Sequence, residues 1–201
     1  MATGSGTTGI CAAILAGGQG RRMGQPKTEV SVGASSLLAL VSRQLQPRCR
    51  EIYLSVKPGG STAAHGSWNI VEDFREEQTP IAGIVSLLES CGEEQLLITC
   101  CDLVCDPPEL LDLLLDHSSG PNRVFRIDGR IMPFPGIYHR DTLPMWQEAL
   151  RLNRLRICSL VEGIPGLEIV DPAGTLTQYR VHNINTADEL KTYGEYLEGR
   201  R

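Results

Sequence analysis

The sequence predicts a three-layer α/β fold with a mostly parallel sheet and an antiparallel insertion in its second half. Short apolar runs alternate with segments whose apolar residues recur at helical spacing, which is the rhythm of βαβ units. The first apolar run, residues 10–16, leads into a glycine-rich loop, as buried parallel strands often do. Later, Asp128-Gly129 separates two strand-like segments, which predicts an antiparallel hairpin.

In the first half, short apolar runs predict strands, and segments whose apolar residues recur at helical spacing predict helices. We predict, in order, a strand at 10–16, a helix at 35–45, strands at 51–56 and 68–71, a helix at 81–90 and a strand at 96–101. Ser35 or Ser36 is a plausible cap for the first helix. Pro80 suits the first turn of the second helix.

The second half departs from the parallel rhythm. We predict a helix at 109–117, strands at 122–127 and 130–138, helices at 140–152 and 155–162, strands at 167–170 and 179–181, and a helix at 186–197. Pro107-Pro108 opens the first of these helices, and Asn185 or Thr186 caps the last one.

Length and composition favour one globular domain. The chain has 201 residues, of which 41% are hydrophobic and 21% charged, and its net charge is -5. These values predict a single domain over residues 1–201, in which residues 1–9 are expected to be disordered. The mild acidity disfavours a non-specific nucleic-acid binder and a coat for anionic membranes, so no nucleic acid or membrane is expected as a partner.

The cysteines and the apolar runs indicate a cytoplasmic protein. Seven cysteines at irregular spacing form an odd set, and residues 1–9 carry neither charge nor an apolar run, so no secretory leader is expected. The longest apolar stretches fall far short of the roughly 20 residues that a bilayer crossing requires. We therefore expect a reducing cytoplasm and no membrane span. Cys100, Cys101 and Cys105 are expected to pack in the core rather than bind zinc.

The segment from residue 15 to residue 27 is the strongest functional signal. Its early glycines let the backbone approach a ligand, and Arg21, Arg22 and Lys27 place three cations close together. A P-loop does not fit, because Gly24 is followed by Gln25-Pro26. A dinucleotide fingerprint does not fit either, because Met23 takes the place of its third glycine. The segment therefore predicts a polyphosphate site of another kind.

Two aspartates follow predicted strands. Asp102 comes directly after the buried strand at 96–101, so its carboxylate is expected at the carboxyl edge of the sheet. One carboxylate together with phosphate oxygens is the usual way to hold Mg²⁺, which makes Asp102 the metal candidate. Asp73, after the strand at 68–71, is a weaker candidate for a ribose hydroxyl or for a water of the metal, and a turn residue is an equal alternative.

Several segments together resemble the molybdenum cofactor guanylyltransferases. The resemblance covers about residues 10–192 in order. It is carried by Leu15-Ala16-Gly17-Gly18, Arg22-Met23-Gly24, Lys27, Glu72-Asp73, Pro80-Ile81-Ala82-Gly83, Cys101-Asp102, Pro135-Gly136-Ile137-Tyr138, Leu155-Arg156 and residues 183–190, Asn-Ile-Asn-Thr-Ala-Asp-Glu-Leu. The opening signature is shared with other nucleotidyltransferases, and the closing one makes the match specific.

The resemblance implies a Rossmann-like nucleotidyltransferase fold, with nucleotide on about residues 10–105 and pterin on about residues 106–192. The residues expected to bind the nucleotide are Leu15, Ala16, Gly17, Gly18, Arg22, Gly24, Lys27, Asp73, Gly83 and Asp102. Lys27, Arg22 and Asp102 are the expected catalytic residues, with Mg²⁺ on Asp102. Arg156, Asn183 and Asn185 match positions on the pterin side.

The activity implied is transfer of GMP from GTP to molybdopterin, with release of pyrophosphate. Gly17-Gly18 after Ala16, where cytidylyl relatives tend to show Ala-Gly, favours guanine. Delivery of the product implies transient contacts with cofactor-synthesis proteins and recipient molybdoenzymes. A cytidylyl or sugar-phosphate transferase of the same superfamily, and a non-catalytic GTP-binding partner in cofactor assembly, remain as alternatives.

Three positions depart from the family's pattern. The family usually has a proline two positions after the aspartate of Cys101-Asp102, and here that position is Val104. A glycine commonly precedes the Pro-x-x-Gly element, and here that position is Thr79. Asp188-Glu189 replaces Pro-Glu-Glu or Pro-Glu-Asp, an acidic substitution that suits the first turn of a helix.

Overall fold

The computed structural model describes residues 9–16, 31–32, 35–58, 68–73, 79–116, 120–175 and 178–199. Residues 1–8, expected to be disordered, lie outside the described residues, as does most of the glycine-rich segment, residues 17–30.

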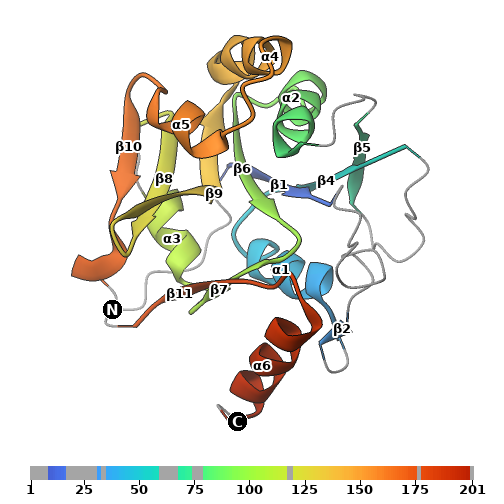
Figure 1. Ribbon diagram of the computed structural model, residues 1–201, viewed down its shortest axis with the longest axis vertical. Coiled ribbons are helices and arrows are strands. Elements are labelled where there is room, and N and C mark those ends of the chain that lie inside the picture. The colour runs from blue at the N-terminus through green and yellow to red at the C-terminus, as the bar shows by residue number, and fades with distance from the viewer. Residues whose placement is uncertain are drawn as a thin grey trace.

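A seven-stranded sheet forms the centre of the fold, in the order β10-β8-β9-β6-β1-β4-β5 (Figure 1). Its strands are β1 (Cys11–Leu15), β4 (Ile52–Val56), β5 (Asn69–Glu72), β6 (Gln95–Cys100), β8 (Asn122–Ile127), β9 (Arg130–His139) and β10 (Leu167–Val170). Neighbouring strands run parallel except that β9 is antiparallel to both β6 and β8. The predicted mostly parallel sheet with an antiparallel insertion is confirmed.

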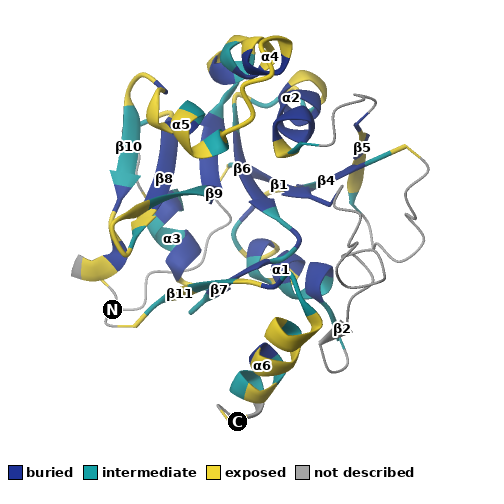
Figure 2. Ribbon diagram, in the orientation of Figure 1, coloured by how far each residue is buried: buried dark blue, intermediate teal, exposed yellow. Residues whose placement is uncertain are grey.

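Helices cover both faces of the sheet and make three layers. One face packs against α1 (Leu37–Leu45) and α3 (Leu110–Leu115), and the other against α2 (Pro80–Ser90), α4 (Leu143–Arg151) and α5 (Ile157–Glu162). Successive residues of a strand point to opposite faces, so one strand feeds both layers. In β1, Ala12 and Ile14 enter one core cluster, while Ala13 enters the other. Figure 2 shows the resulting buried centre.

A two-stranded antiparallel ribbon lies beside the main sheet, next to α1 (Figure 1). It pairs β7 (Leu103–Asp106) with β11 (Arg180–Asn183), and α6 (Ala187–Glu198) follows it. The side chain of Gln44 on α1 holds β7, because its amide donates to Cys105 O at 2.6 Å and its carbonyl accepts from Cys105 N at 3.1 Å. The sequence did not predict β7, whose pairing partner lies far along the chain.

The remaining elements are short. They are the strands β2 (Ser31–Val32) and β3 (Ser35–Ser36), which pair with each other, and the 3₁₀ turns η1 (Arg140–Thr142) and η2 (Pro172–Gly174). Residues 140–142, predicted as the start of a long helix, form η1, and α4 begins at Leu143, with Pro144 inside its first turn. None of the described helices is long and apolar enough to cross a membrane.

Several predicted caps and turns are present. Ser36 accepts from Ala39 N and begins α1, and Thr186 forms a capping box with Glu189 at the start of α6. In the hairpin, Asp128 and Gly129 have φ of 50° and 74°, so both central residues are left-handed, as a type I′ turn requires. The local signals used for these elements therefore identified them correctly.

A buried aromatic cluster joins β9 to α4. The Tyr138 ring meets Trp146 edge-on with centroids 5.7 Å apart, and Trp146 Nε1 donates to Thr142 Oγ1 at 3.0 Å. The Tyr138 hydroxyl turns back to donate to Pro133 O at 2.5 Å. The Tyr138–Pro133 hydrogen bond spans an irregularity in the β8–β9 register. Val124 pairs with Gly136 there, and the next residue of β8 pairs with Met132. Gly136 lies inside this bend.

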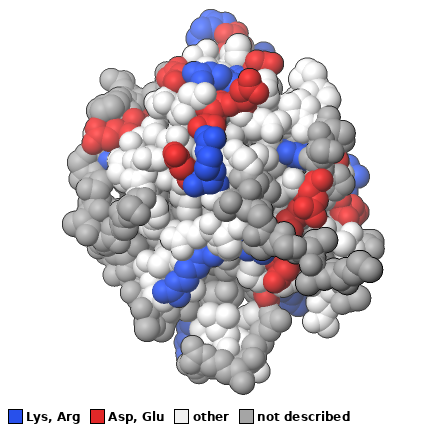
Figure 3. Space-filling view, turned by 180° about the vertical axis from the view of Figure 1, so that it is seen from behind, with Lys and Arg blue, Asp and Glu red and all other residues white. Residues whose placement is uncertain are grey.

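Charged side chains of both signs are interspersed over the face opposite to that of Figure 1. Figure 3 shows groups of Lys and Arg beside groups of Asp and Glu there, separated by uncharged surface. This distribution accords with the modest net charge of -5.

Two glycine substitutions test the packing with opposite expected signs. A Cβ on Gly136 would lie 2.6 Å from Pro133 O, a backbone atom, so Gly136→Ala is expected to cost about 1–3 kcal/mol of unfolding free energy. Gly194 in α6 has open space around its Cβ position, so Gly194→Ala is expected to gain up to about 1 kcal/mol. Urea unfolding of both variants measures the difference. If the two variants were equally stable, the close approach of Gly136 to Pro133 O would be contradicted.

Candidate functional site

The carboxyl ends of four adjacent parallel strands meet at one edge of the sheet. In the order β5-β4-β1-β6, the pairs Val56 with Glu72, Leu15 with Ser55 and Leu15 with Cys100 are in register. Backbone hydrogen bonds extend beyond the strand ends, from Ala16 N to Ser55 O at 2.9 Å and from Cys101 N to Leu15 O at 3.1 Å. This edge carries Ala16 and the two candidate aspartates, as the position of each after its strand predicted.

Leu15, Ala16 and Gly83 form the packed floor of this edge. Leu15 and Ala16 are 9% and 8% exposed, and each lies in one of the two core clusters. Gly83 is in α2, where a Cβ would come within 2.7 Å of Leu15 Cδ2 and 3.3 Å of Ser55 Oγ. The missing side chain at Gly83 thus lets α2 pass close over the ends of β1 and β4. This close approach is a packing reason for the glycine that the sequence did not reveal.

Asp73 is buried and held from two sides. Its residue exposure is 2%; Lys57 Nζ lies 2.6 Å from Asp73 Oδ2, and Ser86 Oγ donates to Asp73 Oδ1 at 3.0 Å. Lys57 follows β4 and Ser86 is in α2, so the carboxylate links two strand ends to the helix above them. Both oxygens of Asp73 therefore have protein partners, which fix the position of the carboxylate.

Asp102 sits where the main sheet meets the β7–β11 ribbon. It follows β6 and precedes β7, and its carbonyl accepts from Ile184 N at 2.9 Å. Its side chain is half-buried. Leu103 pairs with Asn183 in the ribbon, so the end of β11 lies beside Asp102. Residues distant in the sequence are thereby brought to the metal candidate.

The two asparagines expected on the pterin side lie at this junction. Asn185 Nδ2 donates to Asn183 Oδ1 at 2.6 Å, and the backbone N–H groups of Asn185 and Thr186 donate to Glu189 Oε2. The capping box at the start of α6 therefore fixes the turn that carries both side chains. The backbone hydrogen bond from Ile184 N to Asp102 O places this turn beside Asp102.

Arg156 occupies a different position. It directly precedes α5, on the sheet face covered by α2 and α4, and its side chain is exposed. It is available to a ligand from that side. The remaining expected nucleotide residues, Gly17, Gly18, Arg22, Gly24 and Lys27, lie outside the described residues.

The donor chemistry of Asp102 fits a magnesium ion. Mg²⁺ prefers oxygen ligands, keeps several waters, and is commonly bound by one or two carboxylates plus substrate phosphates. A half-buried carboxylate at the carboxyl edge meets that requirement. Within the described ranges, no group of three or more His, Cys, Asp or Glu side chains is arranged as a metal cluster of its own.

Cys101 and Cys105 are buried in the core and Cys100 packs against it, as predicted, whereas Cys158 is exposed. All seven are free, and Cys100 and Cys101 enter the two different core clusters on opposite faces of the sheet. Burial raises the pKa of Cys49, Cys91 and Cys105 to about 12, so these thiols stay protonated at neutral pH. A protonated thiol is a poor metal ligand and nucleophile.

The three departures from the family's pattern have local explanations. Thr79 is the N-cap of α2, since its hydroxyl accepts from Ala82 N at 3.3 Å. Val104 is buried in β7, where it pairs with His182. Glu189 completes the capping box of α6. Thr79 and Glu189 thus take part in the caps of α2 and α6, and Val104 packs in the core.

Sequence reasoning missed Lys57, Ser86 and Gln44. Lys57 directly follows β4 and Asp73 directly follows β5, and these two strands are parallel neighbours. The position of Lys57 after a predicted strand could therefore have identified it as a neighbour of Asp73. Ser86 and Gln44 gave no signal, because a single polar residue on a helix identifies no partner. Their roles come from the packing of α2 and α1.

The model of the MobA-like NTP transferase domain family matches residues 12–161. A probable molybdenum cofactor guanylyltransferase of Carboxydothermus hydrogenoformans is 30% identical over 151 residues, which are 74% of this chain and 75% of that protein. A molybdenum cofactor guanylyltransferase of Ectopseudomonas mendocina is 27% identical over 183 residues, with 88% of each chain covered.

Solved structures show the same fold at low sequence identity. The molybdopterin-guanine dinucleotide biosynthesis protein A of Archaeoglobus fulgidus superposes with a TM-score of 0.72 at 19% identity, covering 94% of this chain and 100% of its own. The inositol-1-phosphate CTP transferase of T. maritima superposes with a TM-score of 0.71 at 12% identity, covering 94% of both chains.

The matched segment runs from β1 to α5 and contains the whole carboxyl edge, with Asp73 and Asp102. With this match and the likeness to the Carboxydothermus protein, the chain belongs to the MobA-like NTP transferase domain family and is a nucleotidyltransferase.

Proposed function

We propose that this nucleotidyltransferase transfers GMP from GTP to molybdopterin and releases pyrophosphate. The observation that carries the proposal is the junction at Asp102, where the carboxyl edge of the sheet meets the turn that carries Asn183 and Asn185. Such a junction suits a reaction between two substrates that each bind one half of the chain. The names of the curated relatives support guanine and the molybdenum cofactor as the substrates.

The nucleotide side is assigned to the first half of the chain. In this proposal Gly17, Gly18, Arg22, Gly24 and Lys27 hold the triphosphate through backbone amides and cations. Leu15 and Ala16 form the floor beneath it, and Gly83 and Asp73 line the nucleoside part of the pocket. Asp73 does so as part of a fixed unit, because Lys57 and Ser86 hold its carboxylate.

The acceptor side is assigned to Asn183, Asn185 and Arg156. Amide side chains offer both donors and acceptors to the edge of a pterin, and a guanidinium pairs well with a phosphate. Asn183 and Asn185 are pre-ordered by their mutual hydrogen bond and by the capping box that follows. They hold the acceptor beside Asp102.

The reaction is an in-line substitution at the α-phosphorus of GTP. An oxygen of the terminal phosphate of molybdopterin forms a bond to the α-phosphorus. The bond between that phosphorus and the oxygen bridging the α- and β-phosphates breaks, and pyrophosphate leaves with the electron pair of the broken bond. The attacking phosphate is already an anion, so no general base is needed. Lys27 and Arg22 offset the charge that grows on the leaving pyrophosphate.

Asp102 would hold Mg²⁺ together with phosphate oxygens. The ion, when bound, neutralises phosphate charge at the reacting centre. The chain itself fixes the backbone position from which this carboxylate projects. It does so through the hydrogen bonds from Ile184 N to Asp102 O and from Cys101 N to Leu15 O. Positioning and charge stabilisation then account for the rate.

A reducing cytoplasm is the proposed location, supported by the seven free thiols. Transient contacts with cofactor-synthesis and recipient proteins are proposed with it, because the product has to be handed on.

An assay of pyrophosphate release with GTP, CTP and UTP, each with and without molybdopterin, tests the function. We expect release with GTP that depends on molybdopterin. A preference for CTP or UTP would make the chain a cytidylyl or sugar-phosphate transferase. Binding of GTP and Mg²⁺ without release would make it a non-catalytic partner.

Replacement of the metal candidate is expected to remove turnover. Asp102→Asn keeps the shape of the side chain and removes the charge that holds Mg²⁺, so pyrophosphate release should be lost while the thermal unfolding midpoint stays unchanged. Asp141→Asn, at a carboxylate 91% exposed, is the matched control and should leave turnover as it is. Near-normal turnover of Asp102→Asn refutes the assigned role.

Removal of the lysine at the triphosphate is expected to slow the chemical step. Lys27→Ala should cost about 3 kcal/mol of transition-state stabilisation, or roughly a hundredfold in kcat, if its ammonium group meets the leaving group. Single-turnover kinetics at saturating GTP measure this loss. A variant whose kcat stays within threefold of the original protein would remove Lys27 from the mechanism.

Two buried serines provide a matched test of the Asp73 unit. Ser86→Ala removes a hydrogen bond to a buried carboxylate, so we expect a loss of about 1–3 kcal/mol of unfolding free energy and a higher KM for GTP. Ser42 in α1 is 2% exposed, and within the described residues its hydroxyl has no hydrogen-bond partner. Ser42→Ala should therefore be neutral or stabilising. Equal effects at both serines would show that the Asp73 contact contributes nothing.

A further inference from the structure

The backbone of β11 turns alternate residues toward and away from β7. In an antiparallel pair, every second residue exchanges hydrogen bonds with the partner strand, and the residues between them point their N–H and C=O groups the other way. Ile184 N donates to Asp102 O, and the register of the ribbon places these two residues opposite each other. Counted back along β11, His182 and Arg180 therefore also face β7.

The outer edge of β7 is covered by a side chain. Cys105 lies opposite Val181, so its backbone groups point away from β11. Both are engaged by Gln44, whose amide donates to Cys105 O at 2.6 Å and whose carbonyl accepts from Cys105 N at 3.1 Å. The Gln44 side chain thus takes the place that a neighbouring strand would have.

The outer edge of β11 has no such cover among the described residues. Val181 and Asn183 point two N–H and two C=O groups away from β7, and in that part of the chain β11 pairs with β7 alone. No hydrogen bond between described residues reaches these four groups. Val181 is half-buried and Asn183 is exposed. A row of open backbone groups is a template for pairing with another strand.

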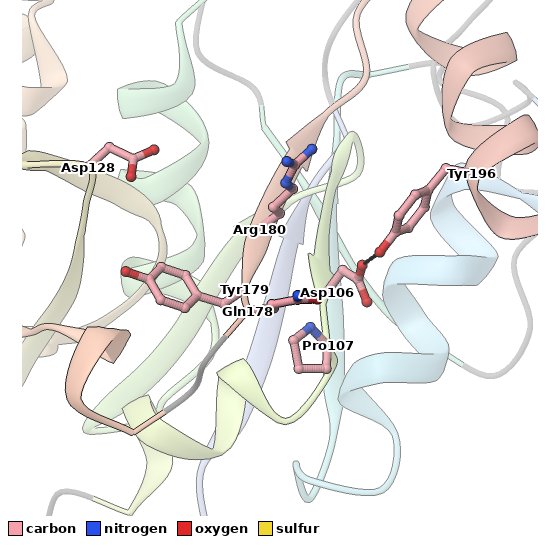
Figure 4. Close-up of a pocket in the computed structure, with 7 residues that line it drawn as sticks. All are labelled: Asp106, Pro107, Asp128, Gln178, Tyr179, Arg180 and Tyr196. Atoms are coloured by element: carbon pink, nitrogen blue, oxygen red, sulfur yellow. Dashed lines mark hydrogen bonds between the residues drawn. The ribbon is translucent and has the colours of Figure 1, made fainter. Parts of the chain in front are cut away.

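Two hollows beside β11 leave room for an incoming chain. One, of about 530 Å³, lies at the start of the strand, where Tyr179 and Arg180 line it (Figure 4). The other, of about 360 Å³, lies between β11 and α6. Arg180 and Tyr196 line both hollows, so the two adjoin along the strand.

Unlike charges mark the two ends of β11. Arg180 begins the strand, and Figure 4 shows its guanidinium pointing away from Asp106, whose carboxylate accepts from the Tyr196 hydroxyl. Asp188 lies in the first turn of α6, shortly after Ile184, and lines the hollow between β11 and α6. Both charged side chains are exposed, and neither makes a hydrogen bond or ion pair with another described residue. Arg180 and Ile184 are about 13 Å apart along an extended strand.

We propose that the outer edge of β11 pairs antiparallel with the same edge of a second copy of this chain, about a two-fold axis at His182. Val181 of each copy then exchanges two hydrogen bonds with Asn183 of the other, so all four open groups of each strand are satisfied. Arg180 comes to lie opposite Ile184 of the second copy, at the end of the strand where its Asp188 stands.

The match to a second copy is one of both register and charge. The two outward-pointing residues are placed symmetrically about His182, so the strand is complementary to its own antiparallel copy. Its cationic end meets the acidic end of that copy twice, once on each side of the axis. Self-complementarity of this kind is what an isologous two-fold interface requires, whereas an unrelated strand would match the backbone groups alone.

The residue on the axis is compatible with close approach. The two copies of His182 face each other as a pair without hydrogen bonds between their backbones, the arrangement in which side chains come closest. In each copy the His182 ring lies 4.9 Å from Tyr193 and 5.3 Å from Tyr196, measured between ring centroids. Burial lowers the pKa of His182, so both imidazoles are neutral at neutral pH and do not repel as two cations would.

This pairing is independent of the proposed transfer. Asn183 contributes its backbone to the pair, and its side chain stays bonded to Asn185. Pyrophosphate release from GTP, measured on the same preparations, separates the two claims. A monomer that releases pyrophosphate refutes this inference alone, and a dimer without release refutes the proposed function alone.

Sedimentation equilibrium of the full chain, from micromolar to submillimolar concentration, tests the proposal. We expect a reversible rise of the mass from that of one chain toward that of two. Val181→Pro removes an outward N–H without touching a hydrogen bond to β7, and proline is accepted on an edge strand when its nitrogen faces outward. This variant should raise the dimer dissociation constant at least tenfold. Val181→Thr keeps the N–H and is its matched control.

A charge exchange tests the register without changing the backbone. Arg180→Glu and Asp188→Arg should each weaken the dimer at least tenfold, because each places like charges together across the axis. The two changes combined restore unlike charges, so the double variant should return to within threefold of the original protein. Arg43→Glu, at an exposed position on α1, is the control and should leave the dimer unchanged.

Three results overturn the proposal. A chain that stays monomeric at submillimolar concentration leaves the edge of β11 to some other partner. A dimer that Val181→Pro, Arg180→Glu and Asp188→Arg all leave intact uses another surface. A double variant no tighter than the two single variants shows that Arg180 and Asp188 do not meet across the axis. Thermal unfolding of each variant confirms that its fold is kept.

Discussion

The hydrogen bond from Ile184 N to Asp102 O is the contact on which the site depends. With the pairing of β7 and β11, it joins the end of the chain to the strand edge formed by its first half. Without that junction, Asn183 and Asn185, the proposed acceptor residues, would not lie beside the carboxyl edge of the sheet. In the proposed reaction, this backbone contact sets where the two substrates meet, and Gln44 supports it by holding β7 against α1.

The strand edge itself is built to be rigid. Gly83 allows α2 to lie close over β1 and β4, and the buried carboxylate of Asp73 ties α2 to the ends of β4 and β5 through Ser86 and Lys57. A buried charge is stable only when it is paired and hydrogen-bonded, and here both conditions hold. The proposed catalysis by positioning requires this kind of scaffold, because in it the protein contributes geometry rather than covalent chemistry.

The sequence predicted most of the main sheet because its signals are local. An apolar run before a glycine-rich loop marked β1, and Asp128-Gly129 marked the hairpin. β7 was missed because Leu103–Asp106 pairs with a strand far along the chain, and four residues carry no period of their own. The same reason hid Ser86 and Gln44, whose partners are set by tertiary packing. The aspartates were found because strand ends place them regardless of distant contacts.

The central claim is that the Asp102 carboxylate and the triphosphate share one divalent ion at the carboxyl edge. Anomalous diffraction from crystals grown with Mn²⁺ and a non-hydrolysable GTP analogue tests it most directly. The account predicts an anomalous peak bonded to a carboxylate oxygen of Asp102 and to phosphate oxygens of the analogue. A nucleotide bound with its metal on other residues, away from Asp102, would contradict it.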